Sequence, residues 1–407
     1  MATSTNALQI TSNLGWQVAA NRLVATTATL LPISARIIAS KYRAGTGQSR
    51  TLNTSRERFV HQQRGARNKQ SRQAVIYSPQ CSANLFQPAR KLPSRSSYST
   101  SAPSAPEPII DDVFEKVTGT WQYLVSDPAT KTAVIIDPVL DYDPATRSIS
   151  TTTADALLAL IKEKGYTIAW ILETHAHADH LTSASYLQKR LAQEQGEEKK
   201  PSIGIGKRIG KVQSLFGQRY GIPEEEYTVV FDKLFEDDEV FTIGELKAQA
   251  MHLPGHTPDH MGYKIGDNVF CGDSIFNADI GTARCDFPGG SAHQLYTSGR
   301  RLLSLPEHVK IWTGHDYPPE GGRAPLAFMT VAEHREKNKH LREGIREDEF
   351  VAMRNERDAS LGAPRLLHQS LQTNIRAGHL PRPTEKHGDR LFHVPVKVKG
   401  GGGVGEW

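Results

Sequence analysis

The chain has 407 residues, enough for one large domain or two ordinary ones, and its apolar content of 38% is low for a chain that packs throughout. The net charge of +5 combines two regions of opposite sign. Residues 1–106 carry 14 Lys or Arg and a single acid, Glu57, whereas residues 107–407 carry 35 basic and 43 acidic residues. An acidic body argues against nucleic-acid binding. No apolar run reaches the ~18 residues of a membrane span. We therefore expect the protein to bind neither nucleic acid nor a membrane.

Residues 1–106 have the composition of a mitochondrial transit peptide and linker, rich in Ser, Thr, Ala and Arg and almost free of acids. The stretch "SARIIASKYR" mixes basic and apolar residues as an amphipathic presequence does, and "RSSYST" resembles a matrix-protease cleavage site. We expect this region to be disordered and the mature protein to lie in the mitochondrial matrix; the alternative is a basic arm that stays attached. Only Cys271 and Cys285 lie in the body, too few for a disulfide framework, which fits a reducing compartment.

From residue 107 the chain alternates short strands with helices. The stretches "WQYLVSD" and "TAVIIDPV" predict paired strands, "TADALLALIKEKGY" predicts a helix, and "TIAWILETH" predicts a buried strand. Next come a helix at "SASYLQKRLAQE", a strand at "SIGIG" and a helix at "RIGKVQSLFGQRYG". Later strands are expected at "EVFTIGELKAQAMHL", "GYKIG", "NVFCGD" and "KIWTGHDY", with a helix at "AHQLYTSGRRLLSL" before the last. We predict two sheets between helical layers over 107–323, and a mostly helical extension with a flexible tail over 324–407.

Coordinating side chains follow four of these strands. They are His175, His177, Asp179 and His180 in "ILETHAHADH", His256 in "MHLPGHTPDH", Asp273 in "VFCGDS" and His315 in "IWTGHDY". Strand ends that line one edge of a sheet can converge on one pocket, and a glycine before each of the last three lets the backbone turn sharply. Imidazole and carboxylate together suit borderline metals, so we predict a metal centre. His252 and His260 are expected to be ordinary hydrogen-bonding residues.

The motifs "THAHADH", "GHT", "GD" and "GHD", in this order, resemble the metallo-β-lactamase superfamily over roughly residues 110–320. The resemblance implies an α/β fold, the αββα sandwich, with the site at one edge of the two sheets. It does not by itself give the reaction, because hydrolases, nucleases and dioxygenases of this fold share the same ligands.

Within the superfamily, the stretch "SIFNADIGTARCDFPGGSAHQLYTS" resembles the persulfide dioxygenases, which oxidise glutathione persulfide with O2 to sulfite and glutathione in mitochondrial sulfide catabolism. This resemblance implies one non-haem iron(II) per chain, held by His175, His256 and Asp273. Two His and one carboxylate leave about three coordination positions open, for the terminal sulfur and for O2. Other residues would orient the ligands, handle protons or contact the oxygen side: His177, Asp179, His180, His315 and Tyr317.

Arg284 and Asp286 match an Arg-x-Asp-Phe element of the family. They are candidate substrate-binding residues: either Arg284 holds a glutathione carboxylate, or it pairs with Asp286 and braces the loop. Cys285, between them, is expected to pack. The 75 residues between His180 and His256, which include the 190–228 segment, and the long C-terminal tail resemble a longer-bodied branch of the group. We expect these additions to serve a homodimer.

The alternative is a dinuclear-zinc thioester hydrolase resembling glyoxalase II (hydroxyacylglutathione hydrolase). One zinc would be bound by His175, His177, His256 and Asp273, and the other by Asp179, His180, His315 and Asp273. A bridging hydroxide, whose pKa the metals lower, would attack the acyl carbon. The stretch "GTARCDFPGG", and the lack of an obvious basic C-terminal glutathione-binding domain in the sequence, favour the dioxygenase. A metal-binding scaffold without turnover is disfavoured because the ligand set is complete.

Overall fold

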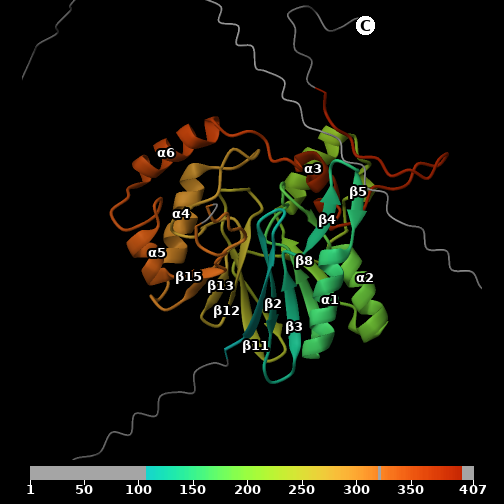
Figure 1. Ribbon diagram of the computed structural model, residues 1–407, viewed down its shortest axis with the longest axis horizontal. Coiled ribbons are helices and arrows are strands. Elements are labelled where there is room, and N and C mark those ends of the chain that lie inside the picture. The colour runs from blue at the N-terminus through green and yellow to red at the C-terminus, as the bar shows by residue number, and fades with distance from the viewer. Residues whose placement is uncertain (1–106, 320–321, 397–407) are drawn as a thin grey trace, which may run out of the picture. The chain divides into compact units, whose positions relative to one another are not determined.

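The computed structural model describes residues 107–319 and 322–396. The predicted transit peptide and linker, and the predicted flexible tail at 400–403, lie outside these residues. In the described part the strands form two six-stranded sheets and one three-stranded sheet. Figure 1 shows the two large sheets side by side between two groups of helices.

In the first large sheet the first three strands are antiparallel and the later strands are parallel. Its order is β1 (Ile109–Glu115), β2 (Thr120–Ser126), β3 (Thr132–Ile136), β6 (Thr167–Leu172), β8 (Ser202–Gly206) and β9 (Lys233–Phe235). The strands from β3 to β9 pair in parallel. Parallel neighbours need crossovers, which the chain makes through α1 (Thr152–Lys164), α2 (Ala184–Gln195) and α3 (Ile209–Tyr220). The carboxyl ends of β3 and β6 therefore meet at one edge.

The second large sheet places three more carboxyl ends together. Its order is β10 (Glu239–Ile243), β11 (Leu246–His252), β12 (Met261–Ile265), β13 (Asn268–Phe270), β14 (Lys310–Trp312) and β15 (Phe328–Thr330). Neighbours are antiparallel except β13 and β14, which are parallel. The strands β11, β13 and β14 therefore run in the same direction and end at the same edge, where the predicted ligands follow them.

Three hydrophobic clusters define the layers. One fills the space between the two large sheets, with Tyr123, Phe235 and Tyr263 among its buried members. A second lies beneath α1, α2 and α3, and it also buries Leu371 of α7 (Leu367–Asn374). A third lies under α4 (Ala292–Leu303), α5 (Val331–Lys337) and α6 (Glu347–Ala359). The helix–sheet–sheet–helix sandwich predicted from the sequence is confirmed.

The smaller elements were less predictable. A three-stranded sheet of β5 (Ser148–Ser150), β4 (Val139–Asp143) and β7 (Leu181–Thr182) was not anticipated, and neither were β1, β9 and β15. Most of these strands have only two to five residues, too few for an alternating pattern to emerge. Short 3-10 helices occur at Glu197–Lys199 and Glu224–Glu226. β15 falls in the segment assigned to the extension, so the extension begins as part of the second sheet.

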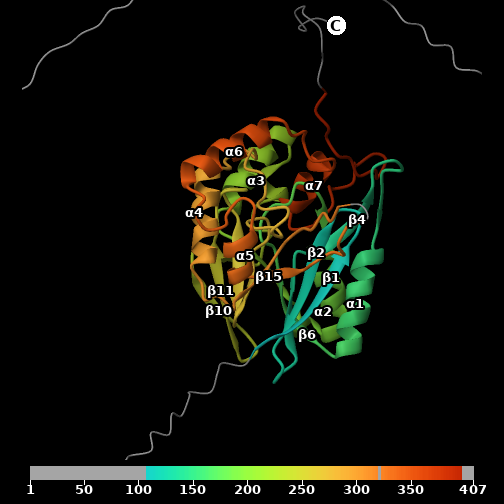
Figure 2. The ribbon, with the colours of Figure 1, turned by 60° about the vertical axis from the view of Figure 1, so that its left-hand side comes forward.

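The later part of the extension, from α6 onward, lies at one end of the sandwich. Figure 2 shows α6, α3 and α7 at the same end of the sheets, and in Figure 1 the chain between α6 and α7 crosses that end. After α7 the described chain is irregular. Among the helices of the described residues, none is both long and apolar enough to span a bilayer.

Candidate metal centre

The predicted ligands of the four strands meet at the shared edge of the two large sheets. They form two groups whose possible ligand atoms lie within 4.8 Å of one another: His175, His256 and Asp273 in the first, and His177, Asp179, His180 and His315 in the second. Asp273 lies between the groups, because its Oδ2 is 3.7 Å from His256 Nε2 and its Oδ1 is 3.5 Å from His315 Nε2. We call them the first and the second metal group.

Two glycines make this close approach possible. Gly272, directly before Asp273, has a φ of +48°, a conformation that residues with a Cβ adopt rarely. Gly314, directly before His315, has an ordinary φ, but a Cβ there would lie 2.5 Å from Asp273 Oδ1. The first glycine therefore allows the turn, as predicted, and the second leaves room for the carboxylate.

In the first group, one nitrogen of each imidazole is tied to the protein and the other faces the centre. Thr174 donates its hydroxyl to Asp137 Oδ2 (2.8 Å), so its oxygen can accept from His175 Nδ1 at 3.0 Å. His256 Nδ1 lies 2.7 Å from the carbonyl oxygen of Arg284, which can only accept, so this nitrogen carries the proton. Both contacts leave the Nε2 lone pair for a ligand, the usual role of such outer partners.

His177 is turned the other way, with Nε2 outward. This nitrogen lies 3.1 Å from Asp137 Oδ1 and 3.3 Å from Glu173 Oε2, both buried. Burial lowers the pKa of His177, but the charges of the two carboxylates outweigh it and raise the pKa well above its ordinary value. A proton therefore stays on Nε2, and Nδ1 faces the centre.

The imidazoles of His180 and His315 both lie near the hydroxyl of Thr120. Thr120 Oγ1 lies 3.3 Å from His315 Nδ1 and 3.5 Å from His180 Nδ1, and Gly119 O lies 3.3 Å from His315 Nδ1. His315 Nε2 lies 3.1 Å from Asp179 Oδ2. Asp179 has a depressed pKa: burial raises it, but the charges of His315 and His180 outweigh burial.

The inward-facing atoms show that these residues fit a metal ion. Buried atoms without a hydrogen-bond partner in the described part of the chain include the Nε2 of His175 and His180 and the Nδ1 of His177, whereas the Nε2 of His315 faces the carboxylates of Asp179 and Asp273. An unpaired buried polar atom costs roughly 1–3 kcal/mol, so such a gathering is unfavourable unless a cation takes the lone pairs. Nitrogen and carboxylate donors together suit zinc or iron, and the donor set does not choose between them.

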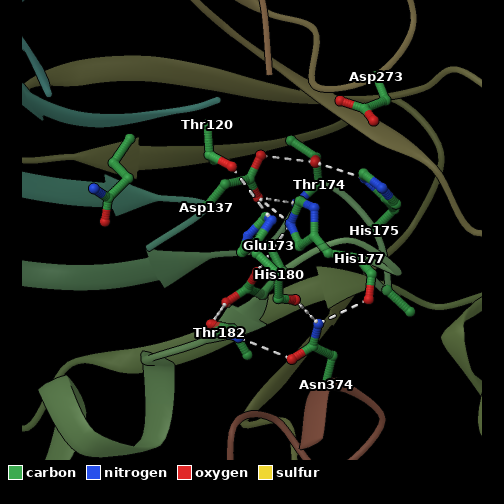
Figure 3. Close-up of polar contacts among 12 residues, drawn as sticks. Thr120, Asp137, Glu173, Thr174, His175, His177, His180, Thr182, Asp273 and Asn374 are labelled. Atoms are coloured by element: carbon green, nitrogen blue, oxygen red, sulfur yellow. Dashed lines mark hydrogen bonds and ion pairs between the residues drawn. The ribbon is translucent and has the colours of Figure 1, made fainter. Parts of the chain in front are cut away.

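A residue of the C-terminal extension holds the His-rich loop from outside. Asn374, the last residue of α7, donates from Nδ2 to the carbonyls of His177 and His180, both at 2.8 Å. Its Oδ1 accepts the backbone N–H of Thr182 at 2.9 Å, and Thr182 in turn donates its hydroxyl to Glu173. Figure 3 shows this network on the side of the loop opposite Asp273.

A cavity of about 380 Å³ opens onto both metal groups through His256, Asp273 and Asp179. Tyr317 lines it, with its ring stacked on His315 at a centroid distance of 5.6 Å and an interplanar angle of 7°. Arg284 lines it as well.

Arg284 pairs with Asp286 through two hydrogen bonds of 2.5 Å and donates from Nη1 to Gly362 O at 2.8 Å. The structure therefore contains the loop brace, one of the two roles considered for Arg284. Asp286 is not among the residues that line the cavity.

The residues expected to be ordinary have ordinary contacts. His260 is buried, and its Nε2 accepts the backbone N–H of Asp273 at 3.0 Å. His252 Nε2 donates to Pro258 O at 3.2 Å. Cys271 and Cys285 are buried free thiols, and burial raises the pKa of each to about 12.

Several residues that touch this site were not predicted from the sequence. Asp137 follows β3 directly and Glu173 follows β6 directly, so the same strand-end argument could have found both. Thr120 and Asn374 carry no such signal, because their contacts join positions far apart in the chain.

Comparison with known proteins places the chain in a family. Residues 116–315 match the model described as "Metallo-beta-lactamase superfamily". Glyoxylase B2 of Dictyostelium discoideum is 46% identical over 70% of this chain and 96% of that protein. A beta-lactamase hydrolase-like protein of Xylella fastidiosa is 42% identical over 72% of this chain, and the chain spans 65% of that longer protein.

Proteins named ETHE1 are more distant. Persulfide dioxygenase ETHE1 of Homo sapiens is 28% identical over 66% of this chain and 89% of that protein. The crystal structure of ETHE1 from Myxococcus xanthus has a TM-score of 0.53 and 27% identity, and it covers 67% of this chain and 100% of that one. The chain thus belongs to the metallo-β-lactamase superfamily of metal-binding enzymes, and its ETHE1 homologues support the persulfide dioxygenase group within it.

Proposed function

We propose that the protein is a non-haem iron(II) persulfide dioxygenase that converts glutathione persulfide, O2 and water into sulfite and glutathione. The observation that carries this proposal is the similarity to the ETHE1 proteins. The first metal group fits it, because two imidazoles and one carboxylate have ligand atoms within 4.8 Å of one another. Two His and one carboxylate with open positions are typical of iron(II) oxygenases.

An iron(II) held by His175, His256 and Asp273 would supply the electron transfer to O2 that side chains cannot provide. The protein's part is to fix the ligands and to manage protons. Thr174 and the Arg284 carbonyl hold two imidazoles with Nε2 facing inward, so little rearrangement is needed when the ion binds.

The reaction releases protons, because the persulfide and water together bring three hydrogens and glutathione keeps one. Imidazoles and a carboxylate of the second group adjoin the first group and can accept them. His177 packs on His175 with ring centroids 4.1 Å apart, and His315 lies 3.5 Å from Asp273. Apolar side chains of the cavity, such as Phe276 and Ile280, limit the water that reaches these groups.

A second candidate is a dinuclear hydrolase, and the second metal group favours it. His177, Asp179, His180 and His315 are all present and mutually close, and Asp273 Oδ1 is near enough to be shared. The name of the Dictyostelium relative points in the same direction. Two metals there would activate a hydroxide for attack on a thioester.

One set of measurements separates the two candidates. Purified protein is assayed for metal content, for O2 consumption with glutathione persulfide and for hydrolysis of S-lactoylglutathione. We expect about one iron per chain, O2 uptake matched by sulfite, and little thioester hydrolysis. Two zinc ions per chain with hydrolysis and no O2 uptake would replace the dioxygenase with the hydrolase.

The proposal extends to location and assembly. We propose that residues 1–106 direct import into the mitochondrial matrix, on the basis of their basic, acid-poor composition, and that the mature chain forms a homodimer. Protein sequencing from isolated mitochondria and light scattering of the purified chain test these points. An N-terminus at Met1 in the matrix fraction, or a monomeric mass, would contradict them.

A further inference from the structure

The C-terminal extension forms one wall of the cavity above the metal groups. Arg357 in the last turn of α6 and Arg365 just before α7 both line it, with Leu361 and Pro364 between them. The other lining residues, Thr118 among them, come from the superfamily body. The extension therefore faces any substrate that reaches the metal groups.

Buried contacts hold this wall in place. Arg354 and Asp358 of α6 are 1% and 7% exposed and form an ion pair of 2.9 Å. Arg354 also donates from Nη1 to Thr282 O (3.1 Å), and Asp358 Oδ2 accepts the N–H of Cys285 (2.7 Å). Arg357 lies between Arg354 and Asp358 on the helix. These contacts therefore fix its backbone position relative to the 282–285 segment.

Three arginines of the extension line the cavity, and two of them, Arg357 and Arg365, have uncommitted guanidinium groups, whereas Arg354 is paired with Asp358. Arg284, which also lines the cavity, is already engaged by Asp286 and by Gly362 of the extension. For the side chains of Arg357 and Arg365, the described residues provide no hydrogen bond and no ion pair. The carboxylates that line the cavity are Asp179 and Asp273, both in the metal groups. The hydroxyl of Thr146 and, more weakly, the charge of Arg365 lower the pKa of Asp143 outside this cavity, but neither Arg357 nor Arg365 forms an ion pair with a described carboxylate.

Arg365 also lines a second cavity. A second cavity of about 310 Å³ shares Val117, Thr118 and Arg365 with the first and reaches His180. Asp143 lines this second cavity near Arg365, but its carboxylate is occupied by the hydroxyl of Thr146 and the N–H of Ala145. Arg365 can therefore contact a molecule in either cavity.

We infer that Arg357 and Arg365 bind carboxylates of the substrate, so that the extension selects an anionic, carboxylate-bearing thiol derivative. The identification of that substrate as glutathione persulfide, a tripeptide with two carboxylates, rests on the proposed function. A guanidinium binds a carboxylate through two parallel hydrogen bonds, which gives orientation as well as affinity. The metal groups would then act on sulfur while the extension holds the tripeptide.

The test compares Arg357→Gln and Arg365→Gln with Arg342→Gln in metal-loaded protein. Arg342 belongs to the same extension and is exposed, but it does not line either cavity. Calorimetry with S-methylglutathione, and with its diester, measures binding without turnover. We expect each cavity variant to bind S-methylglutathione about tenfold more weakly, or 1.4 kcal/mol. The diester should bind all four proteins alike, and KM for the persulfide should rise while kcat stays nearly constant.

Three outcomes would overturn the inference: unchanged affinity in both cavity variants, an equal loss in Arg342→Gln, or an equal loss for the diester. Failure of wild-type protein to bind S-methylglutathione at millimolar concentration would do so as well. If the wild type consumes no O2 but the cavity variants still lose affinity, the proposed reaction fails and the carboxylate site stands.

Discussion

The metal edge of the two sheets and the C-terminal extension serve one site in different ways. Every candidate ligand comes from the edge, where each follows a strand of the superfamily fold. The extension contributes no ligand, but Asn374 holds the His-rich loop and three arginines line the cavity. The difference teaches that the edge supplies the groups that can bind a metal, whereas the extension holds the His-rich loop from outside and lines the cavity above it.

The largest effect should be a loss of bound metal when a ligand at the edge of the two sheets is removed. Asp273→Ala removes the one carboxylate of the first metal group, and we expect the purified protein to be nearly free of metal. The loss should exceed the ~10–100-fold weakening that removal of an outer partner causes. Elemental analysis measures it, with Asp267→Ala, which removes an exposed carboxylate paired with His308, as the control. Unchanged metal content in Asp273→Ala would disprove the assignment of this ligand.

The next largest effect should be on the free energy of unfolding at low pH, and it should come from His334 of the extension. Burial lowers the pKa of His334 in α5 to about 4, and its Nδ1 lies 3.3 Å from the Nδ2 of Asn338, a contact that suits a neutral ring. In the unfolded chain the pKa is about 6.5, so between pH 6.5 and 4 the unfolded state binds more protons. The contribution of neutral His334 is therefore complete above pH 6.5 and is lost as the pH falls, by about 3 kcal/mol at pH 4.

Urea unfolding at a series of pH values tests this expectation. Relative to wild type, His334→Gln should lower stability at pH 7 and flatten its decline between pH 6.5 and 4. The control is His293→Gln, an exposed histidine paired with Glu347, which should leave the slope unchanged. The same slope in His334→Gln and wild type would show that another group causes the acid sensitivity.

A smaller loss of metal affinity should follow when the contact between Asn374 of the extension and the His-rich loop is changed. Asn374→Asp keeps the shape of the side chain but replaces two donors with an oxygen that faces the carbonyls of His177 and His180. We expect metal affinity to fall on the order of tenfold, measured by competition with a chelator. Asn355→Asp, at an exposed position of α6, is the matched control. Wild-type affinity in Asn374→Asp would mean that the loop keeps its geometry without the extension.

The same contrast explains how far the sequence could be interpreted. The ligands could be predicted because each directly follows an apolar run whose direction and burial are local properties of the chain. Asn374 lies in the polar stretch "SLQTNIRAGH", and its role depends on carbonyls 194 and 197 positions away. Arg357 and Arg365 resemble any other exposed arginine until the fold places them around a cavity. Periodicity cannot report contacts of this kind.

The smallest effect concerns Tyr317, which belongs to the edge but is no ligand. Its ring stacks on His315 and is half exposed, and no described residue is hydrogen-bonded to its hydroxyl. Tyr317→Phe keeps the stacking, so we expect kcat/KM to fall less than about fivefold, under ~1 kcal/mol. Tyr317→Ala should cost more, because an aromatic pair contributes roughly 0.5–1.5 kcal/mol. A hundredfold loss in Tyr317→Phe with normal metal content would instead show that the hydroxyl acts on substrate, as the catalytic role predicted from the sequence requires.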